Sequence, residues 1–200
     1  MNLNDAPVFD DVKFAVRPDD GSAYPNLVNW QTKHENTVRE FAALTALKNN
    51  VSNVWAEFGV ENGISAKYFL GHLPPEGRFH LFDSFEGLPE NWEDKPEGYR
   101  KAIRIPRFND WRVTLHPGWF KDMLPLDEIL GFVHIDCDLY SSTKEVLEGI
   151  QVTQGTIILF DELFGYDGYE DHEYKALREY DHPYKFIGRD NKYRAAIEIL

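Results

Sequence analysis

Strand-like and helix-like segments alternate along the chain, and this pattern limits the fold more than any other sequence feature. Seven short apolar runs have the length and composition of strands, at residues 53–60, 78–85, 111–118, 131–138, 155–162, 184–188 and 193–200. Segments with helical spacing precede or separate several of them, at residues 35–49, 63–73, 142–150 and 170–180. This order is typical of an α/β protein with a mostly parallel, Rossmann-like sheet and helices on both faces. Ligands of such sheets bind beyond the carboxyl ends of the strands.

The chain length favours a single domain over residues 1–200. Residues 1–34 have no regular period and contain prolines at three separated positions, so we expect an irregular N-terminal segment. Residues 86–110 form a long stretch rich in proline, glycine and charge. Loops of that length are typically lids or binding loops, and we interpret this one as a candidate lid.

Net charge and composition exclude several classes of function. The formal net charge of −13 disfavours a nucleic-acid binder, which needs a basic face. The single cysteine, Cys137, excludes a disulfide framework. The first residues lack a secretory leader pattern, and no apolar run approaches the ~18 residues of a membrane helix. We therefore expect a cytoplasmic protein with a small-molecule partner and no nucleic acid or membrane; a homodimer is compatible with the sequence.

The first strand-like run leads into AEFGVENGIS, a turn that suits a nucleotide-type cofactor. Gly59 and Gly63 would let the backbone approach a ligand closely. The dinucleotide fingerprint fails, because Glu61 and Ile64 stand where its second and third glycines are required. S-adenosylmethionine (SAM) carries a sulfonium cation and no phosphate, so an acidic turn suits it, and Glu57 could bind its ammonium group. The alternative is an ordinary strand-to-helix turn.

Asp83 ends the second strand-like run, with Ser84 beside it. An acidic group at that position can accept hydrogen bonds from the ribose hydroxyls of an adenosine. The alternative role is a cap of the following turn.

Four carboxylates follow two later strand-like runs. Asp136 and Asp138 occupy alternate positions and share a face if the strand extends that far. Asp161 and Glu162 end the next run, so the two pairs converge if these strands are neighbours. Like charges at one place require a cation or raised pKa values, and oxygen ligands favour Mg²⁺, Mn²⁺ or Ca²⁺. The alternative is that these carboxylates cap the following helices.

The segments EFGVENG, FDSFEGLP, PGWFKDMLP, HIDCDLYSST and ILFDE, in this order, resemble the macrocin O-methyltransferase family. The resemblance covers about residues 54–180. Members are SAM-dependent enzymes that methylate sugar hydroxyls of macrolides. The resemblance implies a class I methyltransferase fold with a seven-stranded sheet, and methyl transfer from SAM to a hydroxyl of a small acceptor such as a sugar.

The resemblance also implies roles for individual residues. The magnesium or manganese ligands, which are also the catalytic residues, would be Asp138, Asp161 and Glu162. Asp136 would lie near the methionine end of SAM, and Trp119 near its adenine. The complete set expected to bind SAM is Glu57, Gly59, Gly63, Ser65, Asp83, Ser84, Gly118, Trp119 and Asp136.

The catalytic histidine of the family has no counterpart in residues 86–110, so we assign no general base. Its absence leaves open a SAM-binding protein without catalysis. A catechol-type metal-dependent O-methyltransferase is the other alternative. Its first metal ligand stands at the position of Asp136 and its later pair is Asp-Asn, so Glu162 argues against it. Four basic residues of the same loop favour an acceptor with a carboxylate or phosphate, or are simply solvated: Arg100, Lys101, Arg104 and Arg107.

Overall fold

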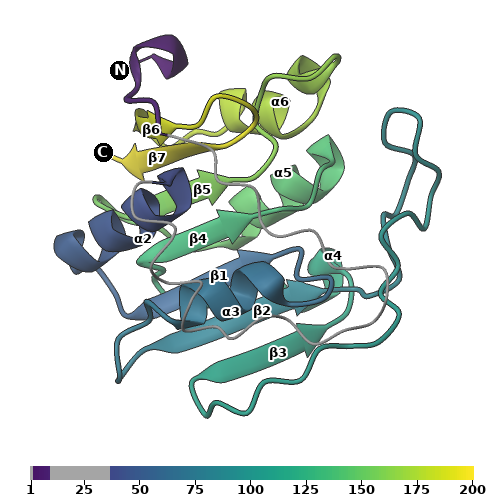
Figure 1. The fold of residues 1–200 in the computed structure, drawn as a ribbon, viewed down its shortest axis with the longest axis horizontal. Helices are drawn as coiled ribbons and strands as arrows, with labels where there is room; N and C mark the ends of the chain where they lie inside the picture. Colours follow the sequence, from purple (N-terminus) through teal and green to yellow (C-terminus); the bar gives the residue numbers. More distant parts are fainter. Residues whose placement is uncertain (1, 10–36) are drawn as a thin grey trace.

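The computed structural model describes residues 2–9 and 37–200, and a twisted seven-stranded sheet forms its centre (Figure 1). The strands are β1 (Val54–Phe58), β2 (Arg78–Asp83), β3 (Val113–Pro117), β4 (Phe132–Ile135), β5 (Ile157–Phe160), β6 (Tyr184–Arg189) and β7 (Ala195–Ile199). Their order is β3-β2-β1-β4-β5-β7-β6. The first five strands pair in parallel, whereas β7 is antiparallel to both β5 and β6. The predicted Rossmann-like fold with a mostly parallel sheet is confirmed.

Helices cover both faces of this sheet (Figure 1). They are α2 (Val38–Asn49), α3 (Ile64–Leu70), α4 (Phe120–Met123), α5 (Tyr140–Gly149) and α6 (Glu173–Arg178), with short 3₁₀ helices η1 (Leu3–Asp5) and η2 (Tyr169–Asp171). Helices α2 and α3 pack on one face, while α4, α5 and α6 pack on the other. The sequence pattern did not indicate the short helix α4. Most of the predicted irregular segment at residues 1–34 lies outside the described residues.

The central strands are apolar on both faces because both faces are covered. All five residues of β1 are buried. Trp55 packs with Phe79 and Phe132 on one face, whereas Phe58 stacks on Phe82 on the other, with ring centroids 4.7 Å apart. Burying one such side chain contributes about 1.5–3 kcal/mol. This rigid core determines where the carboxyl ends of β1, β4 and β5 lie.

Helix α2 begins at Val38, later than the pattern predicted. Thr37 caps it, because its hydroxyl oxygen accepts the Glu40 backbone N–H at 3.2 Å. Leu44, which the spacing assigned to the apolar face, is 50% exposed, whereas Arg39 is only 6% exposed. The buried face of the helix is therefore rotated from the predicted one, and it carries a guanidinium into the interior.

Strand β4 ends at Ile135, so the prediction that it extends to Asp138 is wrong. The chain turns instead: the Leu139 N–H donates to the Cys137 carbonyl at 2.6 Å, and Asp138 has a φ of +63°. Strand alternation therefore does not place Asp136 and Asp138 on a common face. The turn itself brings the two carboxylates together.

In the part of the chain that the structure describes, no helix is both long and apolar enough to span a membrane.

Candidate active site

A cavity of about 770 Å³ opens at the carboxyl ends of the central strands. Its size is typical of a small-molecule site, and its place is the one expected for this type of sheet. The predicted site residues in its lining are Gly59, Ser65, Asp83, Ser84, Gly118, Trp119, Asp136, Asp138, Asp161 and Glu162. Glu57 and Gly63 lie outside the lining. The cavity thus brings together most of the predicted residues, while their ligand contacts stay predictions.

The turn after β1 brings two strand ends into backbone contact. Gly59 has a φ of +89°, and a Cβ at this position would lie 1.7 Å from the Asp136 carbonyl oxygen. Only glycine fits such a conformation and such a close approach. The same glycine donates its N–H to the Phe82 carbonyl at 2.9 Å. Gly59 therefore joins the end of β1 to the ends of β2 and β4.

Asp83 organises this turn. One of its carboxylate oxygens accepts the backbone N–H groups of Val60 and Glu61, both at 2.7 Å. The other accepts the Phe85 N–H at 2.6 Å. A carboxylate has about four lone-pair sites, so bonds to a ribose stay feasible beside these three. The structure supports the turn-capping role directly, and ribose binding stays a prediction.

Glu57 and Gly63 contact other parts of the protein and do not line the cavity. Glu57 is fully buried and accepts the Ser65 hydroxyl at 2.6 Å, so its predicted contact with the SAM ammonium stays a prediction. Gly63 has a φ of +77°, and a Cβ there would lie 2.9 Å from the Phe108 ring and 3.2 Å from Pro106. Gly63 therefore lets the candidate lid pack closely on the start of α3.

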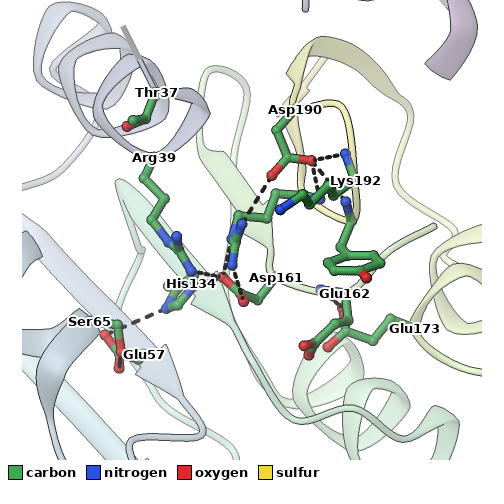
Figure 2. Close-up of polar contacts among 12 residues, drawn as sticks. Thr37, Arg39, Glu57, Ser65, His134, Asp161, Glu162, Glu173, Asp190 and Lys192 are labelled. Atoms are coloured by element: carbon green, nitrogen blue, oxygen red, sulfur yellow. Dashed lines mark hydrogen bonds and ion pairs between the residues drawn. The ribbon is translucent and has the colours of Figure 1, made fainter. Parts of the chain in front are cut away.

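A buried group of charges surrounds Asp161, and we name Arg39, His134, Asp161, Asp190 and Arg194 the ion-pair cluster (Figure 2). Arg39 forms an ion pair with one oxygen of Asp161. Arg194 donates to both oxygens, from Nε at 2.9 Å and from Nη2 at 3.2 Å. Burial alone would raise the pKa of Asp161, but the two guanidinium charges outweigh it and hold that pKa well below its ordinary value. Asp161 is thus ionised, and both of its oxygens are bonded to guanidinium groups.

His134 lies between two carboxylates. Its Nε2 is 3.4 Å from Asp161, and its Nδ1 is 3.6 Å from Glu57. Burial lowers the pKa of His134, but hydrogen bonds and charge from Asp161 and Glu57 outweigh burial and raise it to about 9. We therefore expect a buried imidazolium between the two carboxylates.

A second acidic group consists of Asp136, Asp138 and Glu162, which we name the carboxylate cluster. One oxygen from each lies within 4.8 Å of the others. Burial, together with the neighbouring carboxylate charges, raises the pKa of Asp136 and Glu162 well above the ordinary value and that of Asp138 to about 7. Within residues 2–9 and 37–200, none of the three forms an ion pair with a basic side chain. The N-cap of α5, Leu139, has no side-chain cap, which argues against the alternative capping role.

Glu173 links the two turns that carry these carboxylates. It is fully buried at the start of α6. One oxygen accepts the Cys137 N–H and the other accepts the Glu162 N–H, each at 3.4 Å. Burial, with the charge of Glu162, raises the pKa of Glu173 well above its ordinary value. Glu173 thus holds the turn after β4 beside the turn after β5, and Figure 2 shows it next to Glu162.

The candidate lid crosses the mouth of the cavity and contacts the opposite side. Glu90 accepts the Ser141 hydroxyl at 2.6 Å, at the start of α5. Glu93 lies 3.1 Å from His172, and the Trp92 ring packs edge-on against that histidine. Of the four basic residues in the loop, Arg100 lines the cavity; Lys101, Arg104 and Arg107 are exposed and outside the lining formed by the described residues. The idea of an anionic acceptor thus depends on Arg100.

Three residues near the site were not predicted from the sequence: Arg39, Arg194 and Glu173. A charged residue on the apolar side of a helix was the available signal for Arg39. Its partner Asp161 is 122 positions away, however, and nothing local reveals that pairing. Arg194 and Glu173 lie in segments whose other residues predict an ordinary strand and an ordinary helix.

Two curated relatives are similar to much of the chain. The 8-demethyl-8-(2,3-dimethoxy-alpha-L-rhamnosyl)-tetracenomycin-C 4'-O-methyltransferase of Streptomyces olivaceus is 28% identical over 167 residues, 68% of this chain and 63% of that protein. The demethyldecarbamoylnovobiocin O-methyltransferase of Streptomyces niveus is 30% identical over 141 residues, 57% of this chain and 54% of that protein. The chain thus spans less than two thirds of the length of either relative.

A solved structure and a family model agree with this similarity. The structure of the O-methyltransferase NovP has a TM-score of 0.60 at 24% identity, covering 80% of this chain and 77% of that one. It shows a shared fold. The model of the family described as Macrocin-O-methyltransferase (TylF) matches residues 36–193, most of the chain. The resemblance of the sequence motifs is thereby confirmed, and the protein belongs to the macrocin O-methyltransferase family.

Proposed function

We propose that this protein is a SAM-dependent O-methyltransferase that methylates a hydroxyl of a small, sugar-like acceptor. Family membership supports the reaction class. The names of the two relatives, one of which carries a rhamnosyl group, support a glycoside-type acceptor. The observation that carries the proposal is one cavity with a glycine turn on one side and three carboxylates on the other.

The cofactor would lie along the turn after β1. Gly59 leaves room for close backbone approach, and Asp83, Ser84 and Trp119 line the cavity. Asp83 and Ser84 would face the ribose, and Trp119 would face the adenine. The acidic lining suits a sulfonium cation, because opposite charges attract strongly where water is partly excluded. It suits a dinucleotide less well, since Glu61 stands where a pyrophosphate would approach.

A divalent metal fits the carboxylate cluster. Its three side chains repel one another, form no ion pair with a basic side chain among the described residues, and offer the oxygen donors that Mg²⁺ and Mn²⁺ prefer. Asp138 and Glu162 would hold the ion, because they belong both to this cluster and to the ligand set that the family resemblance implies. When bound, such an ion lowers the pKa of a coordinated hydroxyl and orients it.

The protein's own side chains would position the acceptor for in-line transfer. The acceptor oxygen takes the methyl group and releases its proton to water, while the C–S bond of SAM breaks to leave S-adenosylhomocysteine. Glu90 and its neighbours in the lid exclude water from the mouth of the cavity, and Ser141 holds Glu90 in place. Orientation of this kind supplies much of the rate enhancement in bimolecular reactions.

Two measurements test the proposal. Calorimetry should show binding of SAM and S-adenosylhomocysteine but not of NADH. A transfer assay with SAM labelled on its methyl group should then show product with glycosides or nucleotide sugars and little with catechols. NADH binding without SAM binding would refute the cofactor assignment. SAM binding without transfer to any hydroxyl would favour a non-catalytic role, and transfer to catechols alone would favour the catechol-type alternative.

A further inference from the structure

We propose that the third carboxylate ligand of the divalent metal is Asp136, and that Asp161 does not bind the metal. This inference rests on the proposed function only in that a divalent metal binds this protein. The family resemblance implies Asp138, Asp161 and Glu162 as ligands, and the proposed set replaces Asp161 with Asp136. It also differs from the catechol-type set, because Asp138 remains a ligand.

Two guanidinium groups already occupy both oxygens of Asp161. One oxygen accepts from Arg39 and from Arg194 Nε at 2.9 Å, with His134 Nε2 3.4 Å away. The other oxygen accepts from Arg194 Nη2 at 3.2 Å. A metal at Asp161 would have to bind directly beside two buried guanidinium charges or displace one of them, and breaking one side of a buried ion pair is strongly unfavourable.

The charges around Asp161 oppose a second cation as well. Arg39 and Asp161 are 6% and 5% exposed, so solvent screens their fields little. Two guanidinium groups surround one carboxylate there (Figure 2). Asp190 accepts from Arg194 at 3.1 Å and offsets part of that positive charge. The local charge around Asp161 is therefore already compensated.

Asp136 lies between the two clusters. It offers an oxygen within 4.8 Å of those of Asp138 and Glu162, and one within 4.8 Å of ligand atoms of His134 and Asp161. Unlike Asp161, it forms no ion pair with a guanidinium among the described residues. Glu162 has a buried oxygen, Oε2, without a hydrogen-bond partner, and Asp138 is only 8% exposed and forms no ion pair among the described residues. Buried polar atoms of this kind are rarely left unsatisfied, which points to a missing ligand. A divalent cation between these three groups satisfies both observations.

The position of Asp136 also suits a metal that serves methyl transfer. The Asp136 carbonyl lies against Gly59, at the turn expected to hold the cofactor, and its N–H donates to the Phe58 carbonyl at 2.9 Å. The backbone of Asp136 is thus rigidly placed between the cofactor side and the carboxylate side of the cavity. A ligand on a rigid backbone holds a metal more accurately than one on a flexible loop.

Manganese binding to the intact protein tests the inference without an activity assay. Free Mn²⁺ is measured by electron paramagnetic resonance as protein is titrated, for wild type, Asp136→Asn, Asp138→Asn, Asp161→Asn and an exposed control, Asp167→Asn. Asp136→Asn and Asp138→Asn should each weaken binding by at least about 10- to 100-fold, since even indirect partners of a metal have effects of that size. Asp161→Asn and the control should stay within about 3-fold of wild type.

Asp161→Asn leaves two buried guanidiniums without this carboxylate and could unfold the protein. Circular dichroism checks each variant, and the double variant Arg39→Gln/Asp161→Asn removes one charge of each sign as a second test. Normal Mn²⁺ binding by either Asp161 variant supports the inference. Loss of binding in a folded Asp161 variant, together with normal binding in Asp136→Asn, overturns it, and so does a wild type that binds no Mn²⁺.

Calorimetry with SAM, performed on the same samples, separates this inference from the proposed function. A protein that binds Mn²⁺ through Asp136 but neither SAM nor an acceptor refutes the proposed function and leaves the ligand assignment standing.

Discussion

The ion-pair cluster and the carboxylate cluster meet at adjacent residues of the chain, since Asp161 belongs to one and Glu162 to the other. Both groups are largely buried at the same edge of the sheet, yet only one of them forms ion pairs with guanidinium groups. Arg39 and Arg194 pair with Asp161, whereas Asp136, Asp138 and Glu162 form no ion pair with a basic side chain among the described residues. The difference shows that burial alone does not decide how a carboxylate behaves. A paired carboxylate stabilises the fold, and an unpaired group is available to a ligand.

The largest effect is expected from Asp161→Asn. The change leaves Arg39 and Arg194 buried without their shared acceptor, and breaking one side of a buried pair typically costs about 3–5 kcal/mol. Urea unfolding should show that loss, whereas the exposed control Asp167→Asn should stay within about 0.5 kcal/mol of wild type. An Asp161→Asn variant as stable as the control would mean that the ion-pair cluster does not support the fold.

The same chemical change in the carboxylate cluster should affect activity strongly and stability little. Asp138→Asn removes one of three mutually repelling carboxylates, so the metal-free protein should be at least as stable as wild type. Methyl transfer should fall about 100-fold or more, which corresponds to about 2.7 kcal/mol of transition-state stabilisation. Steady-state kinetics and thermal unfolding measure the two effects separately. Full activity after this change would contradict a role of Asp138 at the reaction centre.

The next smaller effect is the contribution of the carboxylate cluster to the pH dependence of stability. The pKa of Asp138 rises from 3.8 to about 7 on folding. The folded state therefore keeps a proton that the unfolded state loses, and the associated stability is full below pH 3.8 and is lost as pH rises toward about 7. In chelator, the free energy of unfolding should fall from pH 5 to pH 8, and Asp138→Asn should flatten that slope. In the ion-pair cluster, Asp161 is ionised throughout and adds little. His134 adds to the fall above about pH 6.5, because folding raises its pKa from 6.5 to about 9, so the part that belongs to Asp138 is best measured between pH 5 and pH 6.5. A rise in stability across the range would refute the assignment.

The smallest effect concerns Arg100, the lid cation that lines the same cavity. Its side chain is 55% exposed and lies 3.6 Å from Glu61, so its charge is screened. Arg100→Gln removes a repulsion toward a bound cation and should strengthen Mn²⁺ binding by about 2-fold at low salt, with no effect at high salt. Lys101→Gln, at an exposed pair with Glu86, is the matched control. Weaker Mn²⁺ binding by Arg100→Gln would show that Arg100 helps to form the site.

Local pattern was sufficient for the framework of the molecule. The seven strands come from short apolar runs, and a strand buried on both faces can be identified from its own residues. Gly59 follows from the same logic, since a glycine directly after the first strand indicates a close approach. The family motifs were sufficient for the family itself.

Local pattern failed where a side chain depends on a distant partner. Nothing in the local pattern indicated that Glu57 accepts from Ser65 or that Asp83 accepts from the backbone of the turn after β1. The predicted cofactor contacts of both residues stay predictions. The predicted sharing of a strand face by Asp136 and Asp138 failed because β4 ends at Ile135. In each case the sequence shows the residue type but does not show which residues surround it in space.

The sequence by itself determined the order of strands and helices, the glycine turn and the presence of four carboxylates at one edge of the sheet. Only the tertiary structure decided that Asp161 is neutralised while Asp136, Asp138 and Glu162 are not. The reason is that Arg39, on a helix 122 positions before Asp161, and Arg194, on the approach to β7, meet that carboxylate only once the sheet has formed. Electrostatic pairing depends on distance in space, and no local periodicity encodes that distance.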